Sequence, residues 1–118
     1  MKIPNQEFKA AWVAALRSGK YKQGFKLLRS ASDEFCCIGV AEDIAGACWR
    51  ESGHGDYYFT AEACSHEVPD TRDLSTLAAG VCLDTCRVLI EGNCATLYSH
   101  NDAGKTFAQI ADAIEEQL

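Results

Sequence analysis

The sequence lacks a long hydrophobic run, since its longest uninterrupted apolar stretch is the seven residues 10–16. A helix that crosses a bilayer needs roughly 18 apolar residues, so no transmembrane span is predicted. A secretory signal needs a longer apolar stretch followed by a small-residue cleavage site, and neither is found. We therefore expect a cytoplasmic protein with no membrane partner.

The sequence also lacks internal repeats, low-complexity segments and any stretch typical of an interdomain linker. Its 118 residues are close to the commonest domain size. A chain of this length buries roughly two-thirds of its unfolded surface, which is enough for one core. The hydrophobic content of 47% and charged content of 24% are ordinary for a globular protein. We expect residues 1–118 to form a single domain.

Paired C-x2-C spacings, which are typical of structural zinc sites, are missing as well. The chain has seven cysteines, whereas disulfide frameworks of secreted proteins usually have an even number. Cys82 and Cys86 could share a helix face, and Cys64 lies two residues before His66, but neither pair completes a zinc pattern. We predict reduced, buried cysteines and no metal or cofactor, with Cys37 more buried than its neighbour Cys36.

Three segments have the apolar spacing of amphipathic helices. The first begins after Pro4-Asn5, ends at Ser18-Gly19 and has an apolar face made of Phe8, Ala11, Trp12, Ala15 and Leu16. The second spans about 35–47, with Cys37, Val40, Ala41, Ile44 and Cys48 on one face. The last begins with a capping box of Thr106 and Gln109, and its apolar face comprises Phe107, Ile110, Ala111, Ile114 and Leu118.

The remaining segments have weaker patterns. Residues 24–29, 57–60 and 87–90 are predicted strands, the last because of its β-branched residues. Leu74, Leu77, Ala78 and Val81 indicate a short helix after Pro69-Asp70, and residues 49–72 resemble a long loop containing a strand. The fold class predicted is α+β, mostly helical with a small antiparallel sheet.

Charge is distributed very unevenly along the chain. Residues 1–30 carry a formal charge of +6 and residues 31–118 a charge of −12, for a net charge of −6. Such a distribution gives one part of the surface a field that attracts partners of opposite charge. The candidate binding residues are Arg17, Lys20, Tyr21, Lys22, Gln23 and Lys26. The alternative is a solvated face whose cations pair with the protein's own acids, for example Arg17 with Asp112 or Glu115.

Three stretches of the sequence resemble a group of small phage and prophage proteins. They are W-V-A-A-L-R-S-G-K-Y-K-Q-G at 12–24, F-C-C-I-G-V at 35–40 and N-D-A-G-K-T-F-A-Q-I-A-D-A-I-E at 101–115. The resemblance implies a phage accessory protein, and proteins of this kind often block host defences by binding. We therefore expect a non-enzymatic inhibitor of a bacterial defence system such as CRISPR-Cas, bound to a host protein or to a small anionic, nucleotide-type ligand.

Two other classes of function stay open. Residues 17–29 combine cations with an aromatic ring, so they could bind nucleic acid, although a net charge of −6 opposes contact with a long polyanion. A cysteine nucleophile would make the protein an enzyme, but no local pattern selects one Cys–His pair. A reactive thiol would distinguish that class from the others.

Overall fold

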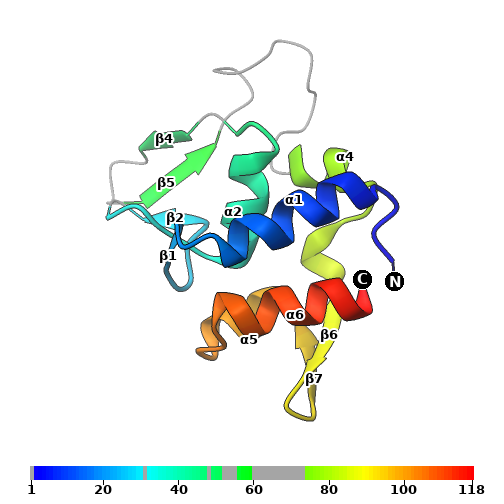
Figure 1. Ribbon diagram of the computed structural model, residues 1–118. Coiled ribbons are helices and arrows are strands. Elements are labelled where there is room, and N and C mark those ends of the chain that lie inside the picture. Colours follow the sequence, from blue (N-terminus) through cyan, green and yellow to red (C-terminus); the bar gives the residue numbers. More distant parts are fainter. Residues whose placement is uncertain (1, 31, 48, 52–55, 60–73) are drawn as a thin grey trace.

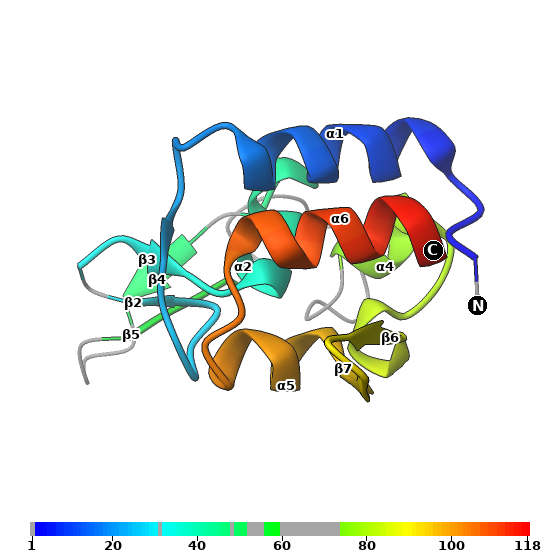
Figure 2. The same ribbon diagram turned by 60° about the horizontal axis from the view of Figure 1, so that its bottom comes forward.

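Two antiparallel helices from opposite ends of the chain form one side of the protein (Figure 1, Figure 2). The computed structural model describes residues 2–30, 32–47, 49–51, 56–59 and 74–118. Helix α1 spans Gln6–Arg17 and helix α6 spans Phe107–Gln117. Because they run in opposite directions, the two termini meet, and the Ile3 amide donates to the Leu118 carbonyl at 2.7 Å.

The caps of both helices are as predicted. The Asn5 side chain accepts from the Phe8 amide at the start of α1, and Gly19 follows the end of α1 with a φ of 77°. Thr106 and Gln109 form the reciprocal capping box of α6. Each cap satisfies amide groups that a helix N-terminus leaves without an intrahelical partner.

Helix α2 is shorter than predicted and spans Cys37–Ile44. Phe35 belongs to a strand, and Cys36 is the N-cap residue, with an extended backbone. The prediction that Cys37 is more buried than Cys36 is wrong, because both residues are 0% exposed. That prediction treated Cys36 as helical, whereas the Cys36 thiol turns back and accepts from the Gly39 amide at 3.3 Å. Cys48, assigned to the same helix face, lies outside the described residues.

A sheet with the order β1-β3-β2-β5-β4 lies at one end of the helices (Figure 2). Its strands are β1 (Lys22–Gln23), β2 (Arg29–Ser30), β3 (Glu34–Phe35), β4 (Trp49–Glu51) and β5 (Asp56–Phe59). The β1–β3 pair is parallel and the other pairs are antiparallel. The predicted strand at 24–29 is wrong for residues 24–28, which form the loop between β1 and β2. The strand at 57–60 corresponds to β5, with Thr60 outside the described residues.

In the rest of the described chain, helix α4 (Leu74–Ala79), the short 3-10 helix η1 (Leu83–Thr85), strands β6 (Arg87–Ile90) and β7 (Asn93–Thr96), and helix α5 (Leu97–Asp102) follow one another. Strand β6 and helix α5 pack against α6, whereas α4 packs against α1 and α2. Strand β6 matches the prediction, and Glu91 and Gly92, both with positive φ, form its turn to β7. The short helix predicted from Leu74, Leu77, Ala78 and Val81 is confirmed as α4, although its buried residues are Ser75 and Ala79 and Leu77 is 68% exposed.

One cluster of buried apolar side chains joins α1, α2, α6 and the β6–β7 hairpin. Trp12 is its largest fully buried side chain, and the Trp12 indole donates to the Cys37 carbonyl at 3.0 Å. The α+β class, mostly helical with a small antiparallel sheet, is confirmed. No helix in the described ranges is long and apolar enough to cross a membrane.

Candidate functional site

Arg17 holds α1 against α6. Its Nη2 atom lies 2.6 Å from Asp112 Oδ1, and its Nη1 atom donates to Glu115. The hydrogen bonds that Arg17 donates to Asp112 and Glu115 raise the pKa of Arg17. The structure therefore contains the internal pairing that was the alternative to a binding role for Arg17. The side chain is 40% exposed, but both ends of its guanidinium are engaged by carboxylates.

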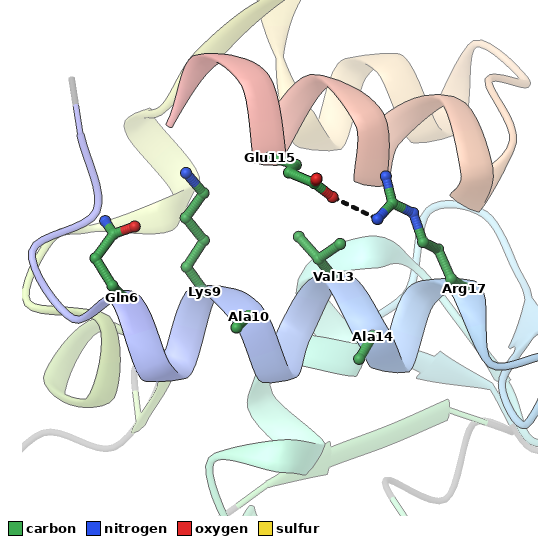
Figure 3. Close-up of a pocket in the computed structure, with 7 residues that line it drawn as sticks. All are labelled: Gln6, Lys9, Ala10, Val13, Ala14, Arg17 and Glu115. Atoms are coloured by element: carbon green, nitrogen blue, oxygen red, sulfur yellow. Dashed lines mark hydrogen bonds and ion pairs between the residues drawn. The ribbon is translucent and has the colours of Figure 1, made fainter.

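A shallow groove of about 410 Å³ lies beside this ion pair, along the side of α1 (Figure 3). Lys9 and Arg17 come from α1, and Glu115 comes from α6 (Figure 3). Ala10, Val13 and Ala14 supply the apolar part of its lining. Since Glu115 already neutralises Arg17, the groove is not a concentrated positive site, and we do not assign it to an anionic ligand.

Tyr21 and Gln23 are half-buried, and both contribute to internal contacts. The Tyr21 hydroxyl donates to Asp43, and its ring packs edge-on against Phe35. Burial, together with the hydrogen bond to Asp43, raises the pKa of Tyr21 to about 12. The Gln23 side chain donates to the Lys105 carbonyl at 2.7 Å and accepts from the Phe107 amide at 3.2 Å. Both residues therefore position the segment rather than present a free polar group.

Asn101 is a fully buried side chain at which the three resembling segments meet. Its amide nitrogen donates to the Gly24 carbonyl at 2.8 Å. Its oxygen accepts from the Cys37 amide at 3.1 Å and from Gln23 at 3.2 Å. The residues that carry the resemblance thus form one hydrogen-bond network that fixes residues 22–24 against α2 and α5.

The remaining cations of the segment are exposed. Lys20, Lys22 and Lys26 all lie at the surface, and the Lys22 side chain is 74% exposed. Lys22 Nζ is 3.5 Å from Glu34 Oε2, a loose surface pair of the kind that contributes little to stability. Within the described part of the chain, the side chains of Lys20 and Lys26 have no ion pair. Of the six candidate residues, these three lysines are available for binding.

An exposed aromatic residue lies between Lys22 and Lys26 in the sequence and was not among the candidates. Phe25 is 52% exposed and occupies the loop between β1 and β2, directly before Lys26. In the strand predicted at 24–29, the orientation of Phe25 would be set by alternation between the two faces of the sheet. Its exposure follows instead from the hydrogen bonds that hold the loop, which join residues far apart in sequence. We define Lys20, Lys22, Phe25 and Lys26 as the basic loop surface.

Cys36, Cys37 and Cys86 lack the lowered pKa of a catalytic nucleophile. Burial raises the pKa of Cys36 to about 11 and also raises the pKa of Cys37 and Cys86. A nucleophilic cysteine needs the opposite shift, because the thiolate is the reactive form. Cys94 is the exposed cysteine of the described set.

The described residues also contain no group of three potential ligands that could hold a metal ion. Cys82 and Cys86 flank η1 as its cap residues and do not share a helix face. The ring of His100 is buried, with Nε2 2.8 Å from the Val88 carbonyl oxygen. Cys64 and His66 lie outside the described residues.

Comparison with known proteins identifies the family of the chain. Residues 4–118 match the model of a family described as a domain of unknown function (DUF8296), so the protein belongs to that family. No curated protein and no solved structure gives a significant match.

Proposed function

We propose that this protein is a cytoplasmic phage or prophage accessory protein that acts by binding a host protein. Its target would belong to a bacterial defence system, such as CRISPR-Cas, and binding would block that target without chemical reaction. The contact is made by the basic loop surface, and the host surface it recognises is acidic. The resemblance of residues 12–24, 35–40 and 101–115 to small phage proteins supports the biological setting.

The observation that carries the proposal is that some cations of residues 17–29 are paired with the protein's own carboxylates, whereas others are exposed. Arg17 is neutralised by carboxylates of α6, and Arg29 is bound to Asp33 and packed over the rings of Phe35 and Trp49. The three lysines remain at the surface, in the same stretch of chain as the exposed Phe25. Aromatic residues anchor many protein interfaces, and cations around them steer the encounter with an acidic partner.

The test is affinity capture from a lysate of the bacterial host, followed by mass spectrometry. Wild type is compared with a variant that combines Lys20→Gln, Lys22→Gln and Lys26→Gln. A control combines Lys2→Gln, Lys9→Gln and Arg87→Gln, which removes the same charge from other parts of the surface. We expect one host protein to be retained by wild type and by the control, and to be lost from the loop variant. Equal retention by all three proteins would disprove binding through the basic loop surface.

Nucleic-acid binding is the second candidate, since Phe25 could stack on a base while Lys22 and Lys26 contact phosphates. The test is fluorescence anisotropy with a labelled single-stranded oligonucleotide over a range of salt concentrations. Contact with phosphates predicts an affinity that falls steeply as salt increases, because bound counterions are released. An absence of binding at low salt would eliminate this candidate.

A further inference from the structure

The loop between β1 and β2 is fixed to the body of the protein along its length. At its start, the Gly24 amide donates to the Phe35 carbonyl at 2.7 Å and the Gly24 carbonyl accepts from Asn101. In its middle, the Lys26 amide donates to the Asp102 carboxylate at 2.8 Å. At its end, the Leu28 carbonyl accepts from the Cys36 amide at 3.3 Å. A loop held at three points has little conformational freedom left to lose on binding.

Lys26 has a backbone conformation that is unfavourable for a residue with a side chain. Its φ is 67°, in the left-handed region, where a Cβ atom approaches the following carbonyl. Such conformations persist where surrounding contacts impose them, and they are concentrated at functional sites. In this conformation the Lys26 amide donates to the Asp102 carboxylate.

Phe25 is the residue that this arrangement presents to solvent. Its ring is 52% exposed although the backbone on both sides is anchored. Burying such a ring in a partner removes a large apolar area from water, and the anchored backbone lowers the entropic cost of doing so. An aromatic side chain on a preformed loop is therefore well suited to act as the central anchor of an interface.

We propose that Phe25 inserts into an apolar pocket on the host protein, and that carboxylates at the rim of that pocket receive Lys22 and Lys26. This inference rests on the proposed function and adds the residue that supplies most of the affinity. The partner is a protein pocket rather than a nucleic acid, because a net charge of −6 opposes contact with a long polyanion far more than contact with a few carboxylates at the rim of a pocket.

Site-specific photo-crosslinking in the host cell tests this proposal. The photoreactive residue p-benzoylphenylalanine replaces Phe25 in one variant and Lys22 in a second. Two controls carry it at Leu77 and Leu89, which are 68% and 54% exposed on other surfaces. We expect one host-protein adduct from positions 25 and 22 and no such adduct from the controls. An adduct from position 22 without one from position 25 would overturn the anchor role and leave the proposed function intact.

An absence of adducts from both loop positions would overturn the anchor role and the proposed function together. A nucleic-acid adduct at position 25 would overturn the protein pocket. With the captured host protein as the probe, Phe25→Ala is expected to raise the dissociation rate at least about tenfold, as for a hot-spot residue. Lys22→Gln should instead lower the association rate and its salt dependence. An unchanged dissociation rate for a folded Phe25→Ala variant would contradict the anchor role.

Discussion

At the scale of single residues, a buried polar side chain rather than a charged one determines the position of the loop between β1 and β2. Asn101 is fully buried and bonds to the Gly24 carbonyl, the Cys37 amide and Gln23. A buried backbone group that loses its partner keeps the full cost of its desolvation. Asn101 therefore links the stability of the protein to the position of its basic loop.

Asn101→Ala is expected to lower the free energy of unfolding substantially. The substitution leaves the Gly24 carbonyl and the Cys37 amide unpaired, at about 1–3 kcal/mol for each group. Urea denaturation followed by circular dichroism measures the change. Asn93→Ala is the control, because Asn93 is exposed at the tip of the β6–β7 hairpin. Equal stability of the two variants would show that the Asn101 network contributes little.

The described thiols are expected to react with iodoacetamide in the order of their exposure. Cys94 is exposed and should be alkylated first, while Cys36 and Cys37 should react only after unfolding. Burial raises the pKa of Cys36 to about 11, so near neutral pH almost none of it is thiolate. Peptide mass spectrometry after timed alkylation measures the order. Rapid labelling of Cys36 in the native protein would revive the hypothesis of a nucleophilic cysteine.

At the scale of elements, the end of the loop between β1 and β2 makes a close backbone contact with α2. A Cβ atom added to Gly39 would lie 1.8 Å from the Leu28 carbonyl oxygen. This contact requires a residue without a side chain, and the same Leu28 oxygen accepts from the Cys36 amide. The start of α2 and the end of the loop therefore cannot move independently.

Gly39→Ala is expected to be far more destabilising than Gly19→Ala. Gly19 has a φ of 77° with nothing within 4 Å of an added Cβ, so alanine there meets only backbone strain of about 1–2 kcal/mol. At position 39 the backbone of α2 or of Leu28 must move as well. Thermal unfolding of both variants provides the comparison. A smaller loss for Gly39→Ala would contradict the close packing of α2 on the loop.

The β6–β7 turn is joined to the residues just before α6 through a pH-dependent contact. Lys105 Nζ lies 2.8 Å from Glu91 Oε2, and this hydrogen bond, with the positive charge of Lys105, lowers the pKa of Glu91. A carboxyl whose pKa is lower in the folded state stabilises the fold above its unfolded pKa, and this contribution disappears as pH falls through the folded pKa. NMR titration of Glu91 should give a higher pKa in Lys105→Gln than in wild type. Identical titration curves would show that the pair does not form in solution.

Helices α1 and α6 could be predicted from local sequence, and most of the loop could not. Both α1 and α6 have continuous apolar stripes and cap residues within one turn, so local rules suffice for them. The strand predicted at 24–29 failed because residues 24–28 bond to Asn101, Asp102 and Cys36, which are distant in sequence. The burial of Cys36 was missed for a related reason, since its capping role depends on where α2 begins.

The candidate site was predicted only in part. Charge counting identified the segment but not which cations have internal partners. The internal pairs of Arg17 required knowledge that α1 and α6 lie side by side, which no local pattern provides.

For the whole molecule, the uneven charge distribution is the feature that connects sequence to proposed function. Part of the positive charge of residues 1–30 is used internally, because Arg17 and Arg29 are paired with carboxylates. The exposed remainder includes the basic loop surface, on a protein whose net charge is −6. This polarity favours encounter with an acidic partner in one orientation.

A phage plating assay tests this account most directly. The bacterial host carries an active CRISPR-Cas system that targets the phage. The host expresses one of three proteins: wild type, the loop variant that combines Lys20→Gln, Lys22→Gln and Lys26→Gln, or the control that combines Lys2→Gln, Lys9→Gln and Arg87→Gln. The account predicts that wild type and the control restore plaque formation and that the loop variant, although folded and equally abundant, does not. Equal plating with the loop variant and wild type, or no restoration by wild type, would contradict it.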